Sequence, residues 1–160
     1  MKIVTDIEYL RKPCKDLTEA QDLDIIVETL KTEIYLGGVQ RGVGLAANQI
    51  YIPYRVCLIS VGIMVPLILV NPVIVKEQKP KLVREGCLSL PGVDIEIERP
   101  MYVKVKALDE SRRPVKYTFT GERAQCVRHE IDHLNGILMI DYLDKGERAA
   151  IESRLRRSQS

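Results

Sequence analysis

The sequence predicts an α+β fold in which mixed or antiparallel β-sheets pack around a central helix, with one helix before the strands and a short helix near the C-terminus. Short segments rich in β-branched residues and bounded by turn-forming residues follow one another between positions 54 and 120. Helical patterns precede and follow this block instead of alternating with it, which is typical of the α+β class. The 160 residues contain no internal repeat and no linker-like segment, so we expect residues 1–160 to form a single domain.

The helix before the strands is expected at residues 20–38. Its apolar residues recur every three or four positions, so one face of the helix is apolar. Glycine commonly ends a helix, and two glycines stand at the end of this pattern. The apolar face consists of Leu23, Ile26, Val27, Leu30 and Ile34, and the terminating residues are Gly37 and Gly38.

Seven strand-like segments follow this helix. Residues 93–98 and 102–107 alternate strictly between apolar and polar residues, as antiparallel strands with one buried face do. The other segments are shorter apolar runs. The seven segments are 54–60, 67–70, 72–75, 81–86, 93–98, 102–109 and 115–120.

An uncharged stretch from Val56 to Val75 is long enough to suggest a membrane span. However, it is dense in β-branched residues and is interrupted by glycine and proline, which favours consecutive buried strands. We therefore expect no membrane segment here. The interrupting residues are Gly62, Pro66, Asn71 and Pro72.

Two helices are expected after the strands. The first covers residues 121–135, and Gly136 follows it as a helix-ending glycine. It contains the start of the segment HEIDHLNG, residues 129–136, and is the central helix of the predicted fold. The second runs from about Lys145 to Arg156.

Composition and charge exclude several classes of protein. The formal net charge is only +2, from 24 basic and 22 acidic residues, so nothing indicates direct nucleic-acid readout. The N-terminal segment MKIVTDIEYLRKP carries charged residues throughout, unlike a signal peptide. Without an export signal the four cysteines are expected to be reduced, and we expect a cytoplasmic protein.

The segment HEIDHLNG contains both histidines of the chain, His129 and His133, on either side of Glu130. On a helix, residues four positions apart are separated by about 6 Å and share one face. Two imidazoles placed in this way can bind one metal ion, and the glutamate can accept a proton from an activated water molecule. The pattern therefore predicts a catalytic metal site, which needs a third protein ligand and an open fourth position.

The third ligand is not decided by this motif alone. A third histidine is excluded, because position 139 is methionine and no other histidine exists. Glu152, about twenty residues downstream, keeps open the possibility of a zinc endopeptidase. Cys126 lies one turn before His129, and three ligands strung along one helix cannot meet at a tetrahedral ion.

Among the other thiols, Cys87 is the leading candidate for the third ligand. It lies in the segment EGCLS, where Gly86 allows close backbone approach and polar residues surround the thiol. Cys57 lies within an apolar run that is typical of the core, and Cys14 has no site-like surroundings. From the residues alone, Cys87 is favoured and Glu152 remains open.

Three segments of the chain resemble the signature motifs of the peptide deformylases. These are GVGLAANQ at residues 42–49, EGCLS at residues 85–89 and HEIDHLNG at residues 129–136. They occur in the order found in that family, and the resemblance extends over nearly the whole chain. A glycine-rich apolar segment alone is weak evidence, whereas the three motifs together are a specific match.

The resemblance implies a role for each matching residue. Cys87, His129 and His133 would bind one divalent metal ion with water in the fourth position, and Glu130 would be the general acid and base. The Gln49 side-chain amide and the Leu88 backbone N–H would hold the oxygen of the tetrahedral intermediate. The residues expected to contact the substrate are Val43, Gly44, Glu85, Gly86 and Cys126.

The same resemblance implies the reaction. The family removes the formyl group from the N-terminal formyl-methionine of nascent chains at the ribosome and releases formate. The implied metal is Fe²⁺, with Zn²⁺, Ni²⁺ or Co²⁺ as substitutes. Two alternatives are an HExxH zinc endopeptidase that uses Glu152 and a catalytically degenerate metal-binding module.

Three positions depart from the pattern of the family. Arg128 stands where glutamine commonly precedes the first histidine. Glu122 and Gln125 share a helix face with Cys126 and His129, and this face helps to line the methionine pocket in the family. Apolar residues are usual there, so a shallower and more polar pocket competes with the simpler expectation that both side chains turn toward solvent.

Overall fold

The computed structural model describes residues 3–36, 43–62 and 65–158. Its largest element is an antiparallel sheet of five strands, in which each strand pairs with the next along the chain. The α+β class and the antiparallel pairing predicted from the sequence are confirmed. The strands are β1 (Gly44–Ala46), β2 (Val56–Ile59), β3 (Leu67–Gly86), β4 (Asp94–Leu108) and β5 (Pro114–Thr120).

Two strands are much longer than expected, because several predicted segments are continuous. Residues 67–70, 72–75 and 81–86 all belong to β3, and residues 94–98 and 102–108 belong to β4. The ladder between β3 and β4 continues past the prolines, with register shifts between Val70 and Val73 and between Ile74 and Lys76. Such irregularities bend a strand and increase its twist, so the two strands curve without separating.

Four α-helices and two short 3₁₀ helices complete the described part of the chain. The three predicted helices are present as α2, α3 and α4, while α1 and both 3₁₀ helices were not predicted. The end of α2 that was expected at Gly37 and Gly38 lies outside the described residues. The helices are α1 (Ile7–Leu10), α2 (Leu23–Leu36), α3 (Glu122–Leu134), α4 (Lys145–Ser158), η1 (Ala47–Ile50) and η2 (Met139–Tyr142).

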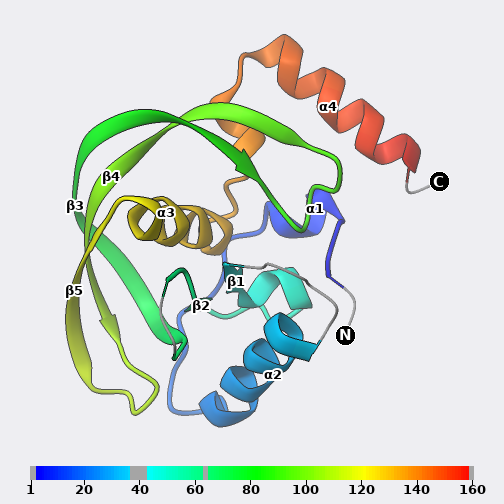
Figure 1. Cartoon of the computed structure of the whole chain (residues 1–160). Helices are drawn as coiled ribbons and strands as arrows, with labels where there is room; N and C mark the ends of the chain where they lie inside the picture. The colour runs from blue at the N-terminus through cyan, green and yellow to red at the C-terminus, as the bar shows by residue number, and fades with distance from the viewer. Residues whose placement is uncertain (1–2, 37–42, 63–64, 159–160) are drawn as a thin grey trace.

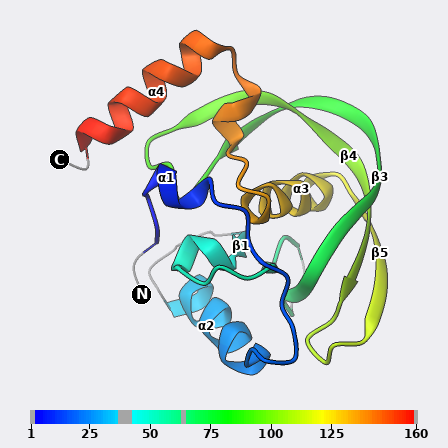
Figure 2. The same cartoon turned by 180° about the vertical axis from the view of Figure 1, so that it is seen from behind.

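Helix α3 lies against the inner face of the curved sheet formed by β3, β4 and β5 (Figure 1). Seen from behind, α1 and η1 lie beside the C-terminal end of α3, and α4 lies apart from it (Figure 2). The core between α3 and the sheet contains fully buried apolar side chains, among them Val127, Leu134, Val103 and Val105. The sheet therefore holds α3 by one face and leaves another face for a site.

Gly136 ends α3 in the way that the sequence predicts. Its φ of +73° is in the left-handed region, which favours glycine. A Cβ atom at this position would also collide with the carbonyl oxygen of Arg11, so the chain can turn closely past α1 only with glycine here. Within the stretch from Val56 to Val75, the described residues include β2 and the start of β3. No helix in the described ranges is long and apolar enough to cross a membrane.

Candidate metal and catalytic site

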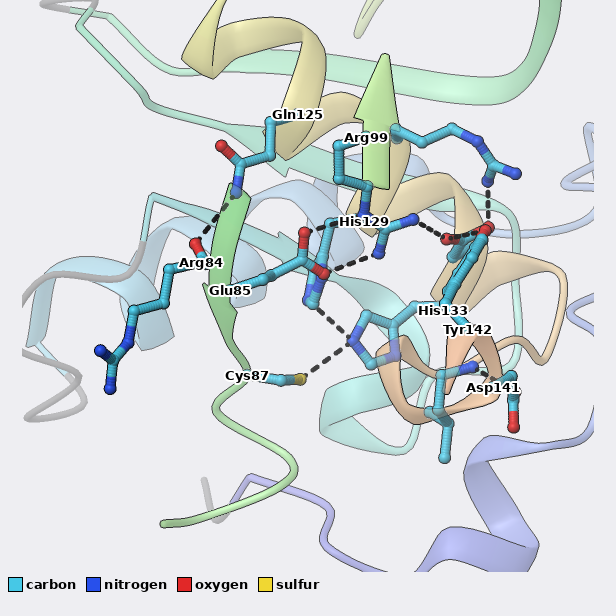
Figure 3. A network of polar contacts seen from close by, with 12 residues as sticks. Arg84, Glu85, Cys87, Arg99, Gln125, His129, His133, Asp141 and Tyr142 are labelled. Atoms are coloured by element: carbon cyan, nitrogen blue, oxygen red, sulfur yellow. Dashed lines mark hydrogen bonds and ion pairs between the residues drawn. The ribbon is translucent and has the colours of Figure 1, made fainter. Parts of the chain in front are cut away.

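Cys87, His129 and His133 come together at one end of the sheet. Cys87 directly follows the last residue of β3, and the two histidines lie one turn apart on α3. The Sγ atom of Cys87 is 3.2 Å from Nε2 of His133, and the Nε2 atoms of the two histidines are 3.2 Å apart (Figure 3). The three donor atoms lie within 4.8 Å of one another and form the one group of this kind among the described residues.

The donor atoms fit a divalent transition metal. At bond lengths of about 2.0–2.3 Å, tetrahedral ligands are separated by about 3.3–3.6 Å, close to the two distances of 3.2 Å, and the third pair of donor atoms lies within 4.8 Å. Burial alone would raise the pKa of the Cys87 thiol, but His133 and His129 hold it well below its usual value. The thiolate is therefore favoured, and one thiolate with two imidazoles is a ligand set suited to zinc or iron.

Glu85 orients the first histidine. Its Oε1 atom lies 2.6 Å from Nδ1 of His129, which places the imidazole proton on Nδ1 and leaves the Nε2 lone pair directed toward Cys87 and His133. Burial tends to raise the pKa of Glu85, but hydrogen bonds from Arg99 and His129 lower it to about 2. Glu85 was expected to contact substrate, and its carboxylate also binds the ring nitrogen of His129 that faces away from the metal site.

Arg99 holds Glu85 in turn. Its side chain is only 1% exposed and donates to both carboxylate oxygens of Glu85, at 2.8 and 2.6 Å. Its remaining nitrogen donates at 2.6 Å to Asp132, one residue before His133 on α3. Asp132 also accepts hydrogen bonds from the Tyr142 hydroxyl at 2.8 Å and from Arg128.

Sequence reasoning assigned no role to Arg99, Asp132 or Tyr142. A signal for Arg99 was available, because the alternation of β4 places it on the same face as Ile95 and Ile97, where an apolar residue is expected. A charged residue on the buried face of a strand needs a partner of opposite charge. The identity of the partners depends on contacts between distant segments, and the sequence offers no signal for them.

Glu130 is buried beside the histidines, with 3% of its surface exposed. Burial raises the pKa of its carboxyl to about 7, although the histidines act in the opposite direction. Its Oε2 atom has no hydrogen-bond partner among the described residues. A Cβ atom on Gly44 would lie 2.5 Å from Oε1 of Glu130, so glycine is required for β1 to approach the carboxylate this closely.

Gln49 presents its amide nitrogen to the site. Its Oε1 atom accepts a hydrogen bond from the Ala46 N–H at 2.9 Å, which fixes the orientation of the amide. Its Nε2 atom donates to Ser89 at 3.1 Å and lies 3.8 Å from the Cys87 sulfur. The side chain is 2% exposed, so this donor is held in place by its surroundings.

A cleft of about 460 Å³ opens over these groups. Most residues predicted to contact the substrate line it, and so does Arg84, which sequence reasoning missed. Cys126 is not among the lining residues, because it is buried against β1 and its thiol donates to the Val43 carbonyl at 3.4 Å. The lining residues are Val43, Gly44, Gln49, Arg84, Glu85, Gly86, Cys87, Leu88, Gln125, His129 and Glu130.

The two departures on α3 differ in position. Gln125 lines the cleft, and its amide nitrogen lies 3.5 Å from the Arg84 carbonyl oxygen (Figure 3). Glu122 is exposed and is not among the lining residues. Gln125 therefore makes the rim of the cleft polar, whereas Glu122 turns toward solvent.

Glu152 does not belong to this group. Its carboxylate forms an ion pair with Arg11 at 2.7 Å in a separate cluster formed by α1, η2 and α4. Among the described residues, Glu152 is not part of the metal-binding group. The structure therefore supports Cys87 over Glu152 as the third donor and weighs against the endopeptidase alternative.

Comparison with known proteins agrees with this geometry. Residues 1–149 match the family model described as polypeptide deformylase. A peptide deformylase of Thermoanaerobacter pseudethanolicus is 42% identical over 150 residues, covering 91% of this chain and 92% of the relative. One from Caldanaerobacter subterraneus is 43% identical over 143 residues, covering 86% of this chain and 87% of the relative.

Solved structures show the same similarity. A peptide deformylase from Legionella pneumophila matches with a TM-score of 0.87 at 34% identity, covering 99% of this chain and 94% of that chain. One from Synechococcus elongatus, solved in complex with actinonin, matches with a TM-score of 0.84 at 32% identity, covering 96% of this chain and 86% of that chain.

Proposed function

The chain belongs to the polypeptide deformylase family, and on that basis we propose how its residues perform the reaction. It is a hydrolase that removes the formyl group from the N-terminal formyl-methionine of polypeptides and releases formate. The observation that carries the assignment of roles is the convergence of Cys87, His129 and His133 beside the buried Glu130.

Cys87, His129 and His133 hold one divalent ion in this proposal. Iron(II) is the native metal, and Zn²⁺, Ni²⁺ or Co²⁺ can replace it. A divalent ion bound there would supply Lewis acidity, which would lower the pKa of water and polarise the formyl carbonyl. The buried carboxylate of Glu85 supports this arrangement, because it keeps the Nε2 lone pair of His129 available for binding.

Glu130 is the general acid and base. It takes the proton of the attacking water and later gives it to the departing amine, so that the amine leaves in neutral form. A carboxyl whose pKa is raised to about 7 can exchange a proton in both directions near neutral pH. Its burial beside Gly44 keeps bulk water away from the carboxylate.

Gln49 and Leu88 hold the oxygen on which negative charge develops. The Gln49 amide nitrogen is directed toward the Cys87 side of the site, and its oxygen is occupied by the Ala46 N–H. Leu88 follows Cys87 in the cleft wall, where its backbone N–H is the second donor. Donors that are fixed before the reaction stabilise the transition state without reorganisation.

The polypeptide binds as an added strand. β1 is the edge strand of the sheet, and residues Glu85 and Gly86 pair with β4 on one side only. The two edges border the same cleft, which Val43, Gly44 and Gly86 line and where Gly86 is exposed. An extended peptide can hydrogen-bond to such edges.

The methionine side chain enters the cleft beside Gln125, above the buried Cys126. The amide of Gln125 makes the rim of this pocket more polar. The substrates are nascent chains emerging from the ribosome. The protein acts in the cytoplasm, and its residues 1–160 fold as one domain.

The reaction is tested by measuring formate release from a formyl-Met peptide, with cleavage of internal peptide bonds measured in parallel. We expect formate release without internal cleavage. Glu130→Gln keeps its size and should retain the metal and the peptide but lose turnover by at least ~10²-fold, as expected for a general acid and base. A variant with near-normal kcat would transfer this role to another residue.

Gln49→Leu tests the proposed oxyanion contact. The variant should lose roughly 10²-fold in kcat with little change in KM, because the contact strengthens as charge develops. Asn48 next to it binds the His133 carbonyl at 2.7 Å instead of facing the cleft. Asn48→Leu therefore controls for disturbance of η1, and a change confined to KM in Gln49→Leu would contradict the proposal.

A further inference from the structure

Arg128 is the residue before His129, yet it faces a different part of the molecule. It is not among the residues that line the catalytic cleft. It lines a separate cavity between α3, η2 and the two long strands, together with Glu77, Arg99 and Tyr142. Arg128 therefore has no direct contact with substrate, and any influence on the reaction must pass through other residues.

Arg128 completes the hydrogen bonding of a buried carboxylate. The Asp132 side chain is 2% exposed, and its Oδ2 atom accepts from Arg99 and from Tyr142. Its Oδ1 atom accepts from Arg128, which is the one donor to this oxygen among the described residues. Without Arg128, this oxygen would be a buried acceptor without a partner, which is costly for a charged group.

Arg128 also balances the charge of the group. Arg99 is one buried cation shared by two carboxylates, those of Glu85 and Asp132. Arg128 supplies a second cation, so the charges of Arg99, Arg128, Glu85 and Asp132 sum to zero, while the further carboxylate of Glu77 is 39% exposed to solvent. On its outer side Arg128 pairs with Glu77 at 2.6 Å, which fixes its guanidinium between β3 and α3.

The two carboxylates compete for the same guanidinium. Arg99 uses two nitrogens for Glu85 and one for Asp132. If Asp132 loses Arg128, its uncompensated charge draws Arg99 toward itself and weakens the two-point contact with Glu85. Glu85 in turn fixes the proton and the ring plane of His129.

We propose that Arg128 is a positioning residue that keeps His129 in its metal-binding orientation through Asp132, Arg99 and Glu85. This inference rests on the proposed metal site, because it concerns one of its ligands. It assigns a role to the arginine that stands before the first histidine of the HEIDH segment.

The test titrates Co²⁺ alone into metal-free protein and uses the visible absorption of the bound ion. Three proteins are compared: the unmodified chain, Arg128→Met and Arg123→Met. Arg123 is the matched control, because it lies on the same helix but donates to the carbonyls of Val61 and Gly62. Both substitutions remove one positive charge from α3.

We expect Arg128→Met to bind Co²⁺ on the order of 10-fold more weakly, at the low end of the effect of residues that support metal ligands. Its ligand-field bands should shift, because the orientation of His129 changes. Arg123→Met should match the unmodified chain in both measurements. Arg128→Lys, which keeps the charge and one donor nitrogen, should recover most of the affinity.

Two results would overturn the inference. The first is an Arg128→Met protein whose Co²⁺ affinity and spectrum equal those of Arg123→Met. The second is an unmodified chain that binds Co²⁺ without a thiolate charge-transfer band. This result would contradict the proposed metal site itself, so it is distinguished from a failure of the role of Arg128 alone. If Arg128→Met does not fold, Arg128→Gln replaces it, with an expected affinity between those of the lysine variant and the methionine variant.

Discussion

Two networks centred on arginine each join segments that are distant in the sequence, and they differ mainly in burial. Arg99 is 1% exposed and joins Glu85 at the end of β3 to Asp132 on α3. Arg11 is 29% exposed and joins Asp141 in η2 to Glu152 on α4. Both arginines contact two carboxylates at 2.6–2.9 Å, so the local chemistry is nearly the same.

The difference in solvent access determines what each network can do. The carboxylates around Arg99 are only 5% and 2% exposed, so their positions are fixed and Glu85 can orient His129. The carboxylates around Arg11 are about one-fifth exposed, so water can replace part of their contact with the arginine. A buried network therefore transmits position to a functional residue, whereas a half-exposed network mainly ties α1 to η2 and α4.

The largest effect is expected for Arg99→Met. Removing this cation leaves two carboxylates buried without their shared partner, and breaking a buried pair in this way costs about 3–5 kcal/mol. The free energy of unfolding in urea measures this loss. A loss as small as that of Arg11→Met would show that burial does not separate the two networks.

Glu85→Gln should mainly affect metal binding. The variant keeps its shape but loses the charge that holds the Nδ1 proton of His129, and such substitutions weaken metal affinity by about 10–100-fold, or about 1.4–2.8 kcal/mol. Competition with a chelator measures the dissociation constant. Glu152→Gln removes the same charge from the Arg11 network and should leave the affinity unchanged, and equal losses in both would contradict the comparison.

Arg11→Met should cost less than Arg99→Met. Hydrogen bonds to charged groups contribute about 1.5–3 kcal/mol, and partial exposure reduces the expected loss to about 1 kcal/mol. Urea denaturation measures the change. Arg156→Met, which alters a more exposed pair with Glu8, serves as the control and should change stability by less than about 0.5 kcal/mol. If Arg11→Met lowered the free energy of unfolding by several kcal/mol, the two networks would not differ in their contribution to stability.

The smallest effect concerns the pH dependence of the Arg11 network. Burial tends to raise the pKa of Asp141, but the hydrogen bonds from Arg11 and from the Leu138 N–H hold it below its usual value. A lowered pKa contributes stability above the unfolded value of about 3.9, and this contribution disappears as the pH falls below it. The stability difference between the unmodified chain and Asp141→Asn should therefore be largest at neutral pH and should shrink below about pH 4. A difference that is constant from pH 7 to pH 3 would contradict this expectation.

Local patterns in the sequence determined much of the fold. The spacing of Leu23, Ile26 and Leu30 predicts α2, the alternation after position 93 predicts most of β4, and Gly136 marks the end of α3. The spacing of His129 and His133 is enough to place both on one face of a helix, because the helical period brings every fourth residue to the same side. These features follow from backbone geometry over a few residues, so short-range periodicity is sufficient to detect them.

Tertiary structure decided what depends on distant contacts. Only the tertiary arrangement, in which β4 pairs with β3 and also packs against α3, brings Cys87 to the histidines and leaves Glu152 with Arg11. The length of β3 could not be predicted either, because pairing with β4 carries the strand past prolines that interrupt the local pattern. The partners of Arg99 are likewise invisible in the sequence, since a buried charge indicates that a counter-charge is needed but not which distant segment provides it.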